Sequence, residues 1–561
     1  MKPIRYYIPC LLALSALSCS FLDEEPQVIC PDTFYQSETE VKYGLAGVYG
    51  VMASEAFYGN NYSLMLSNVD DLSYYNRATT NNPSCVFQHD ASTTEIYTAW
   101  TEIYRGIGNA NAFMEAVSET GLDPDGAYYA EARFLRAYYH FILAQAWGDV
   151  PLRTSASRKH EDTSCAASSQ YDVLCWAASE MEECLENITD DISVQPSRVN
   201  RNTVHGILAR LYLFLAGSSV EGPGGKREFY GKAMEHCAAV IETGQHRINP
   251  SYSQVFINMI KDGYDTEWRE SMWEVEFNGD RSSPDRWTNG RIGDVIGLRS
   301  SGREGYESFL CNYSYAMYDG TLQLWNLYWT DDRTAEEDKL GSVTDARQEW
   351  NMPPYNYEGY TSGGVQLYLP SVDRTPYHYR GVSTFDNPVT ARAIRNCGKW
   401  RREIEYEALQ DNMSIYTGIN FPILRYADIL LMYAEASNEY EGAPSQAAYG
   451  HVKAVRDRAG IGTIPFSEYD YSTFRQLVRN ERGRELCFES LRRYDLIRWG
   501  VFVESMGRYG EYVTDDEWVF NNKSIYAAAI GSAVKPRHIL LPIPTIELGV
   551  NDKLVQNKLW R

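Results

Sequence analysis

Apolar residues spaced three or four positions apart recur along most of this chain, in stretches separated by short turns. The first stretch covers residues 95–118, and the second, 127–147, ends at Gly148-Asp149-Val150-Pro151. This spacing places the apolar side chains on one face of an α-helix. Stretches of the same kind follow at 171–187, 201–217, 227–243, 424–440, 445–459 and 473–492. Because a helix with one apolar face must bury it, the sequence predicts a mainly α-helical protein built from helices packed together.

The helices are expected to form antiparallel pairs, each joined by a short turn. Pairs of this kind, repeated at a length of about 34 residues, are similar to tetratricopeptide units, which stack because one pair alone cannot bury its apolar face. We therefore predict a helical scaffold in two parts, an N-terminal region at 95–244 and a C-terminal region at 421–561. The pairs at 95–147 and 424–492 are expected to hold most of the core.

Between the two helical regions, at 245–420, the helical spacing weakens, and Gly, Asn, Asp, Ser, Tyr and Trp become common. A passive connection between helices rarely exceeds about 15 residues, so a segment of this length has its own role. We predict a long, irregular, loop-rich insertion with a few short strands, one of them at 272–277. Residues 19–94 are predicted to form a tether followed by a second loop-rich segment, centred on 57–92.

The charge of the chain excludes some classes of ligand. Its 75 acidic and 52 basic residues give a formal net charge of -23, whereas binding to nucleic acid or to an anionic membrane surface requires clustered Lys and Arg. Beyond the N-terminus no run of about 18 apolar residues occurs, so the sequence predicts no membrane-spanning helix. Of the 11 cysteines, an odd number remains once Cys10 and Cys19 are set aside, which excludes a full disulfide framework.

Common catalytic and metal-binding motifs are absent from the sequence. The chain lacks GxSxG, HExxH, a P-loop, GxGxxG and CxxC, and its Cys and His residues do not have zinc spacing. We predict that the protein is not an enzyme and uses no cofactor. A glycoside hydrolase remains an alternative, because two carboxylates about 5–10 Å apart suffice for that chemistry. Glu485 and Glu489 share one helix face and are the pair considered, but ion pairs with Arg482, Arg484 and Arg492 are expected instead.

The N-terminus has the features of a secretory signal peptide at 1–18. A positively charged start precedes a short apolar stretch, and a small residue, Ser18, stands before Cys19. A cysteine at this place resembles the lipidated cysteine of bacterial lipoproteins, although Ala16 stands where a leucine is usual. An ordinary secreted protein is the alternative. The acidic run 23–25 resembles the surface-export signal that follows the lipidated cysteine in lipoproteins of the Bacteroidetes.

Several longer motifs occur in the order in which one known family has them. They are EARFLRAYY at 131–139, WGDVPL at 147–152, LRYADILLMYAEA at 424–436, ERGRELCFE at 481–489, RYDLIRWG at 493–500 and LPIP at 541–544. On these motifs the chain resembles the SusD/RagB family, the outer-membrane nutrient-binding lipoproteins of the Bacteroidetes. The resemblance covers residues 19–557 and implies a lipid anchor on Cys19, palmitate among its acyl chains.

The resemblance also implies a function. Proteins of this family are held on the surface of the outer membrane by their lipid and capture a glycan without catalysis. The implied partner is a TonB-dependent transporter of the SusC type, over which this protein would close as a lid. Two alternatives stay open: a member of the same family that binds peptide or glycoprotein, and a helical enzyme that degrades polysaccharide. The strongly acidic composition favours a neutral glycan as ligand.

Two loop regions combine aromatic rings, which stack on sugars, with side chains that hydrogen-bond well to sugar hydroxyls. One region is 68–77 and the other is 287–315. The family resemblance implies that these two parts of the chain meet where the glycan lies. The candidate ligand-binding residues are Tyr74, Tyr75, Trp287 and Tyr306 for stacking, and Asp71, Arg77 and Asn289 for hydrogen bonds.

Overall fold

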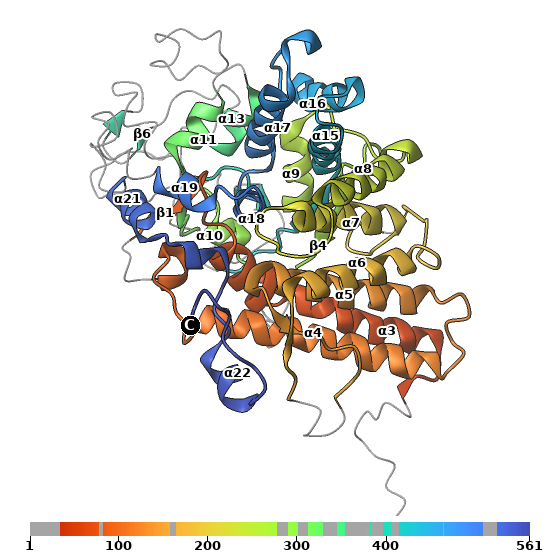
Figure 1. Ribbon diagram of the computed structural model, residues 1–561. Coiled ribbons are helices and arrows are strands. Elements are labelled where there is room, and N and C mark those ends of the chain that lie inside the picture. Colours follow the sequence, from red (N-terminus) through yellow and green to blue (C-terminus); the bar gives the residue numbers. More distant parts are fainter. Residues whose placement is uncertain are drawn as a thin grey trace, which may run out of the picture.

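Most of the long helices pack in chain order, each against the next, to form one continuous stack. The computed structural model describes residues 34–77, 82–157, 164–193, 195–277, 290–300, 312–328, 345–353, 378–379, 382–383, 396–402, 404–405, 415–463, 465–508 and 524–561. This part of the chain is mainly helical, which confirms the predicted fold class. The first helices of the stack are α3 (Glu38–Tyr49), α4 (Thr94–Ser118), α5 (Ala127–Trp147), α6 (Gln170–Cys184), α7 (Arg201–Ala216) and α8 (Lys226–Thr243). In Figure 1 they run from the bottom of the view upward, in red to yellow.

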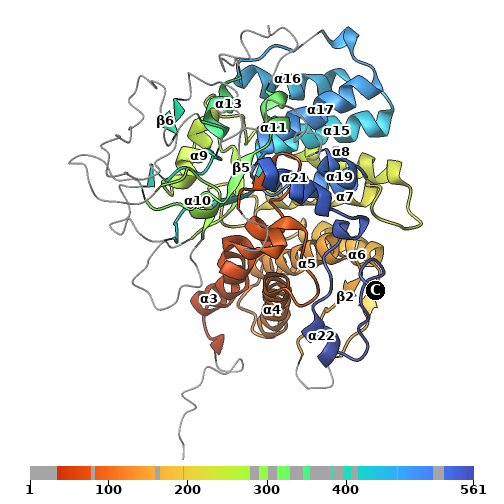
Figure 2. The ribbon, with the colours of Figure 1, turned by 90° about the vertical axis from the view of Figure 1, so that its left-hand side faces the viewer.

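The stack continues after a long gap in the sequence. Helix α8 packs on α15 (Tyr426–Glu441), which in turn packs on α16 (Gln446–Arg458) and α17 (Tyr471–Leu486). The N-terminal and C-terminal helices therefore belong to one stack, as both views show (Figures 1 and 2). Shorter helices follow: α18 (Arg492–Arg498), α19 (Phe502–Gly507), α21 (Ser524–Ala533) and α22 (Thr545–Val550).

Polar caps and a glycine set the ends of several helices. The Asn200 side chain accepts a hydrogen bond from a backbone N–H group in the first turn of α7, and Asp470 and Thr473 form a capping box at the start of α17. Gly148 ends α5 with a positive φ of 82°, and the Leu540 side chain lies 2.9 Å from the point where a Cβ would stand. These local signals explain why most helix limits expected from the sequence are close to the observed ones.

Helix α5 lies at the centre of the N-terminal half of the stack. Nearly all its side chains from Ala130 to Trp147 are buried, because it packs on α3, α4 and α6. Phe134 and Tyr138 also contact Trp273 of strand β4 edge to face. A helix that is buried on nearly all sides belongs in a core, and α5 forms one continuous core with the middle region of the chain.

The strands are short and link distant segments. Strand β4 (Ser271–Val275) pairs antiparallel with β8 (Phe421–Arg425), and β1 (Ser73–Tyr75) pairs antiparallel with β5 (Tyr318–Gly320). Two smaller antiparallel pairs join β2 (Val150–Pro151) to β3 (Ala167–Ser168), and β6 (His378–Tyr379) to β7 (Val382–Ser383). The strand predicted at 272–277 is confirmed as β4. Because β8 occupies the residues just before α15, the helix expected from residue 424 begins at Tyr426.

The helix expected at 473–492 ends early, and a distant segment explains why. Helix α17 stops at Leu486, and Phe488 has a positive φ of 63°. The Lys399 ammonium donates hydrogen bonds to the backbone carbonyls of residues 485 and 487, and the Trp400 indole N–H donates to that of residue 488. These donors take carbonyls that a longer helix would use itself. Tertiary contact, which the local sequence pattern does not show, thus ends the helix.

The loop-rich segments contain more local structure than the sequence suggests. The segment at 57–92 includes the short helical turns η2 (Glu55–Gly59), η3 (Asn61–Leu66) and η4 (Pro83–Val86). The middle region includes α9 (Tyr252–Ile260), α10 (Ile292–Val295), α11 (Leu322–Leu327) and α13 (Ala346–Asn351). Most of the aromatic side chains described at 57–92 are buried, so this segment is a packed part of the core rather than a surface loop.

Candidate functional site

Strands β1 and β5 bring together the two loop regions that hold the candidate ligand-binding residues. The strands run antiparallel, and beyond them the Asn76 side-chain amide donates a hydrogen bond to the backbone carbonyl of Ala316 at 2.9 Å. The regions 68–77 and 287–315 therefore meet, as expected, where Arg77 donates to the Tyr315 carbonyl, and glycan binding at this place stays a prediction. Helix α21 packs on β1, and Figure 2 shows β5 near α10 and α21.

Three side chains beside this pair of strands form a surface that we call the junction surface: Arg77, Tyr313 and Tyr315. The Tyr315 side chain is 37% exposed, and the Arg77 guanidinium lies 5.4 Å from the centre of its ring. The Arg77 guanidinium also donates a hydrogen bond to the Tyr315 carbonyl at 2.6 Å. The Tyr313 ring meets Tyr315 edge to face, with centroids 4.9 Å apart. Burial raises the pKa of Tyr313 to about 12, so its phenol remains a hydrogen-bond donor at neutral pH.

The backbone around the junction surface is held in place by α10. The Asp294 carboxylate accepts a hydrogen bond from the backbone N–H of Tyr315 at 3.0 Å and pairs with Arg291 at 2.5 Å. The Ala316 N–H donates to the Asp294 backbone carbonyl at 2.9 Å, and Ala316 has a positive φ of 44°. A segment fixed in this way presents its rings in a set orientation, which lowers the entropic cost of binding a ligand.

The structure places Tyr74 and Tyr75 differently from what their predicted role requires. Both side chains are buried. The Tyr74 hydroxyl donates a hydrogen bond to Asp319 at 3.4 Å, and the Tyr75 ring packs edge to face on Tyr318 with centroids 6.0 Å apart. Neither ring offers a face to solvent, so the geometry does not support sugar stacking by these two tyrosines. Tyrosines in a short strand are as typical of core packing as of ligand contact, so the sequence did not distinguish the two roles.

Asp71 forms an ion pair instead of the ligand hydrogen bond expected from the sequence. Its carboxylate accepts two hydrogen bonds from the Arg492 guanidinium, at 2.7 and 2.9 Å, and one from Gln323 at 2.7 Å, and the residue is buried. The neighbouring Asp70 caps the turn by accepting from the backbone N–H groups of Leu72 and Ser73. Burial, together with Asp71, raises the pKa of Asp70 to about 8. Both carboxylates are therefore structural.

The other predicted site residues lie outside the described residues: Trp287, Asn289, Tyr306 and the lipidation residue Cys19. Arg77 is the one member of the predicted set that the described structure places at a solvent-accessible ring. Tyr313 and Tyr315 belong to the second loop region named from the sequence but were not among the chosen residues. Their position just before β5 could have indicated them, because residues next to two paired strands lie close to each other in space.

The acidic pair considered for catalysis, Glu485 and Glu489, lies inside the protein. Glu485 accepts hydrogen bonds from three guanidinium groups, those of Arg347 at 3.1 Å, Arg425 at 3.0 Å and Arg458 at 2.6 Å. Glu489 pairs with Lys399 at 2.8 Å and Arg425 at 2.7 Å. Burial opposes ionisation of Glu485, but the three arginines hold its pKa well below the usual range. Carboxylates engaged in this way are not available as an acid, base or nucleophile.

The cations around this pair are not the ones expected from spacing along the helix. Arg482 pairs with Asp428 at 2.6 Å and Asp495 at 2.8 Å, and Arg484 pairs with Glu481 at 3.0 Å. The charges that compensate Glu485 and Glu489 come from α13, β8, α16 and the segment at 396–402. We call this group the buried charge cluster: Glu481, Glu485 and Glu489 with Arg347, Lys399, Arg425 and Arg458.

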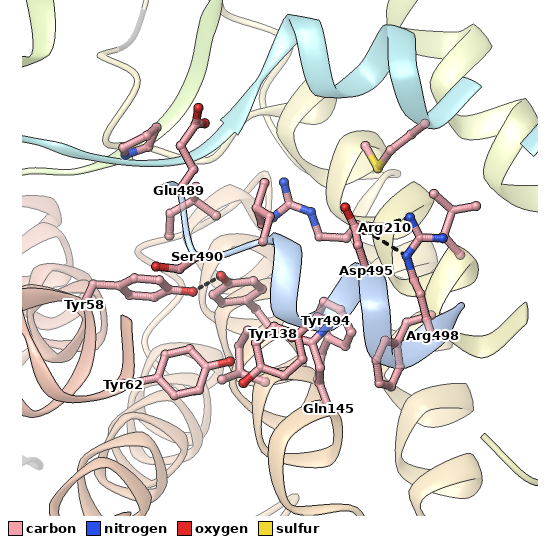
Figure 3. A pocket seen from close by; sticks show the side chains of 18 of the residues that line it. Tyr58, Tyr62, Tyr138, Gln145, Arg210, Glu489, Ser490, Tyr494, Asp495 and Arg498 are labelled. Carbon is pink, nitrogen blue, oxygen red and sulfur yellow. Dashed lines mark hydrogen bonds and ion pairs between the residues drawn. The ribbon is translucent and has the colours of Figure 1, made fainter. Parts of the chain in front are cut away.

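An internal cavity lies where the N-terminal helices meet α18 (Figure 3). The phenols of Tyr58 and Tyr138 hydrogen-bond to each other there, and the Tyr494 hydroxyl lies 3.3 Å from the Ser67 hydroxyl. The cavity has a volume of about 50 Å³, which suits one or two waters at about 30 Å³ each and excludes a sugar ring. It is therefore a small cavity in the core with tyrosine hydroxyls in its wall, and not a candidate ligand site.

The described part of the chain has neither a cluster of metal-binding side chains nor a membrane-spanning helix. Its His, Cys, Asp and Glu side chains form no group of three or more that could hold a metal ion. None of its helices is both long enough and apolar enough to cross a membrane. The seven cysteines it contains, which include Cys397 and Cys487, are all free.

Two family models match most of the chain. The model described as "SusD family" matches residues 269–560, just over half of the 561 residues. The chain belongs to the SusD family. A second model, described as "Starch-binding associating with outer membrane", matches residues 20–213 of this SusD-family protein. The resemblance stated from the sequence motifs is thereby confirmed.

Relatives of this SusD-family protein match it along almost its whole length. SusD-like protein P25 of Formosa agariphila is 24% identical to it, over 99% of this chain and 98% of the relative. The crystal structure of a SusD homologue from Bacteroides thetaiotaomicron has a TM-score of 0.80 at 24% identity, over 94% of this chain and 98% of that one. Surface glycan-binding protein A from Bacteroides uniformis has a TM-score of 0.65 at 17% identity, over 94% of this chain and 100% of that one. These SusD-like structures share its fold.

Proposed function

We propose that this protein is a non-catalytic glycan-binding protein of the cell surface, which delivers its ligand to a TonB-dependent outer-membrane transporter. Membership of the SusD family supports the binding role, as do the description of a matching family model as starch-binding and the name of the Bacteroides uniformis structure. The same family description supports association with the outer membrane. Lipidation at Cys19 and export directed by the acidic run 23–25 are parts of this proposal.

The junction surface is the observation that carries the proposal. An exposed aromatic ring offers its face to the C–H side of a sugar, and Tyr315 is exposed with a guanidinium already beside it. The Arg77 guanidinium gives one N–H to the Tyr315 carbonyl and has further N–H donors for hydroxyl oxygens around that ring. A partly exposed ring with a guanidinium over it is a suitable site for a neutral sugar residue, bound weakly and reversibly.

A catalytic role for the best-placed acidic pair is disfavoured by its environment. Glu485 and Glu489 are buried, and cations of the buried charge cluster occupy them. We therefore propose binding without hydrolysis. An assay for newly released reducing ends, run with each glycan that binds, tests this part: release above the background of heat-denatured protein would contradict it.

Calorimetric titration with a panel of neutral oligosaccharides tests the proposed site. Tyr315→Ala should weaken binding about tenfold or more, because losing a stacking face costs roughly 1–3 kcal/mol. Tyr43→Ala is the matched control, since Tyr43 is 66% exposed on α3 and should be neutral. Wild-type affinity in Tyr315→Ala, with clear binding by the wild type, would show that the site lies elsewhere. Copurification of a barrel-forming transporter from solubilised membranes tests the partner.

A further inference from the structure

A separate pocket lies between β4 and the loop that leads from α9 into that strand. Figure 1 labels α9 and β4 near the centre of the view. The pocket has a volume of about 200 Å³, and its wall includes Asn200, His246, Asn258, Asp265 and Glu274. This volume is several times the ~30 Å³ of one water, and below the ~300 Å³ at which pockets for drug-sized ligands begin. It limits an occupant to a small molecule, such as one sugar residue.

His246 contributes an unused hydrogen-bond acceptor to the pocket wall. Its Nδ1 lies 2.7 Å from the backbone carbonyl of Arg269. Because a carbonyl oxygen only accepts hydrogen bonds, Nδ1 carries the proton and donates it. Nε2 is then unprotonated and has a lone pair that can accept a hydrogen bond. The residue is 4% exposed, and Nε2 has no hydrogen-bond partner in the structure. Burial lowers the pKa of His246, so the ring stays neutral and Nε2 stays an acceptor.

Glu274 contributes a buried carboxylate that lacks an ion-pair partner among the described residues. It is 4% exposed and accepts a hydrogen bond from the Asn420 side-chain amide at 3.0 Å. Burial raises the pKa of Glu274 to about 7, and the nearby carboxylates Glu276 and Asp262 act in the same direction. A carboxylate so placed gains strongly from a cation, since an unpaired buried charge is costly.

The cations that border this region bond to groups other than Glu274. Lys42 and Arg198 line a groove on the other side of Glu274, where Lys42 pairs with Glu38 at 2.9 Å and Arg198 pairs with Glu131. Arg269 lines the pocket itself but donates to two backbone carbonyls, at 2.8 and 3.1 Å.

The remaining titratable groups that face Glu274 or the pocket are acidic or neutral. The Asp265 carboxylate accepts hydrogen bonds from the Trp268 backbone and the Asn249 side chain. Tyr264 donates to Glu276, and burial raises its pKa, so it stays a neutral phenol. Among the charged side chains of the pocket wall, Asp265 and Glu274 outnumber Arg269, so the formal charge of the wall is negative when Glu274 is ionised.

We propose that this pocket binds a small polyhydroxyl molecule that carries a protonated primary amine, the chemistry of an amino sugar. The ammonium group pairs with the Glu274 carboxylate, and a hydroxyl or a second N–H donates to His246 Nε2. The loop that forms one wall is held in an uncommon conformation, with a positive φ of 52° at both Asp262 and Arg269. The site is distinct from the junction surface and does not depend on it.

Titration of the full-length protein with glucosamine, glucose and N-acetylglucosamine tests the proposal. These three probes share a ring and differ at one substituent, which is an ammonium, a hydroxyl or a neutral amide. Glucosamine should bind at least tenfold more tightly than either neutral probe. Equal affinity for the three sugars, or no binding of glucosamine at concentrations up to tens of millimolar, would overturn the proposal.

Two matched variants locate the binding. Glu274→Gln keeps the shape and an acceptor for Asn420 but removes the charge, and should weaken glucosamine binding at least tenfold. Glu276→Gln removes a charge two residues away that lines only the neighbouring groove, and should have a much smaller effect. Equal losses in the two variants would mean that general charge, not the pocket, attracts the amine. Tyr315→Ala should bind glucosamine as the wild type does. The pocket proposal can therefore fail while the junction-surface proposal stands, and the reverse.

The pH dependence gives a test that needs no variant. Between pH 5.5 and 7 the amine of glucosamine stays mostly protonated, whereas Glu274, with a pKa of about 7, goes from mainly neutral to about half ionised. Glucosamine affinity should therefore rise roughly tenfold over this range. Affinity that is flat or falls as pH rises would contradict the role of Glu274. The Glu274→Gln variant should lose this rise.

Discussion

The buried charge cluster and the junction surface both contain arginine, yet the arginines have different roles in the two regions. In the cluster, every carboxylate of α17 meets guanidinium or ammonium groups from other segments, and all are buried. At the junction surface, an arginine lies over a tyrosine ring that is open to solvent. The family motif 481–489 forms the first region, and residues with no motif form the second. The residues that identify the family therefore hold the fold together, and the proposed ligand site lies elsewhere.

The cluster acts as a clamp between distant parts of the chain. Arg425 of β8 binds Glu485 and Glu489, and it also pairs with Glu270 at 2.9 Å, just before β4. Arg347 of α13 binds Glu481 at 2.7 Å. Breaking a buried pair by removing one partner costs far more than an exposed pair contributes, because the remaining charge is left without compensation.

The largest effect that separates the two regions should come from Glu485→Ala. Removing this carboxylate leaves three arginines short of an acceptor, and should lower the free energy of unfolding by about 3–5 kcal/mol. Glu504→Ala is the control, because Glu504 forms an exposed pair with Arg508 and should change stability by about 0–1 kcal/mol. Denaturant unfolding followed by circular dichroism measures both. Equal stability of the two variants would contradict the claim that Glu485 stabilises the fold more than the exposed Glu504–Arg508 pair does.

Acid should destabilise the protein through the ion pairs that surround α18. Burial opposes ionisation of Glu435, but Arg498 lowers the pKa of Glu435 to about 2 from an ordinary 4.5. The unfolded chain then binds more protons than the folded one between these values, so stability present above pH 4.5 is lost as pH falls towards 2. This one group contributes roughly 3 kcal/mol.

Melting temperatures measured from pH 6 to pH 2 test this expectation. Glu435→Gln should be less stable at pH 6 but should lose less stability on acidification than the wild type. Tyr315→Ala, at the junction surface, should keep the full wild-type dependence on pH. An unchanged acid slope in Glu435→Gln would show that the Glu435–Arg498 pair does not carry the effect.

The smallest expected effect on stability comes from a variant of the buried Tyr74, which is compared with a variant of the exposed Tyr315. Tyr74→Phe removes the hydroxyl that donates to Asp319, and should lower the free energy of unfolding by about 1 kcal/mol while glycan affinity stays unchanged. Tyr315→Ala should do the reverse. A large loss of glycan affinity in Tyr74→Phe, at wild-type stability, would restore the ligand role that the sequence suggested for Tyr74.

Local signals in the sequence determined the helices and the family. Apolar spacing, caps such as Asn200 and Asp470, and the glycine at 148 act within a few residues of one another, so they are visible in the chain itself. The short strand β4 and the fold class were predictable for the same reason. The motif 481–489 also marked a helix with charged residues, although its neighbours in space were not visible.

Tertiary structure decided the partners of those charges and the position of the site. Nothing in the spacing along 481–489 indicates that Arg347, Lys399 and Arg425 neutralise its carboxylates, because each cation is 60 positions or more from the carboxylate it pairs with. Tyr74 and Tyr315 are both tyrosines beside short strands, yet one is buried and the other exposed. Whether a ring is exposed to solvent depends on which residues pack over it. In this fold those residues come from segments far apart in the sequence, so local sequence cannot show it.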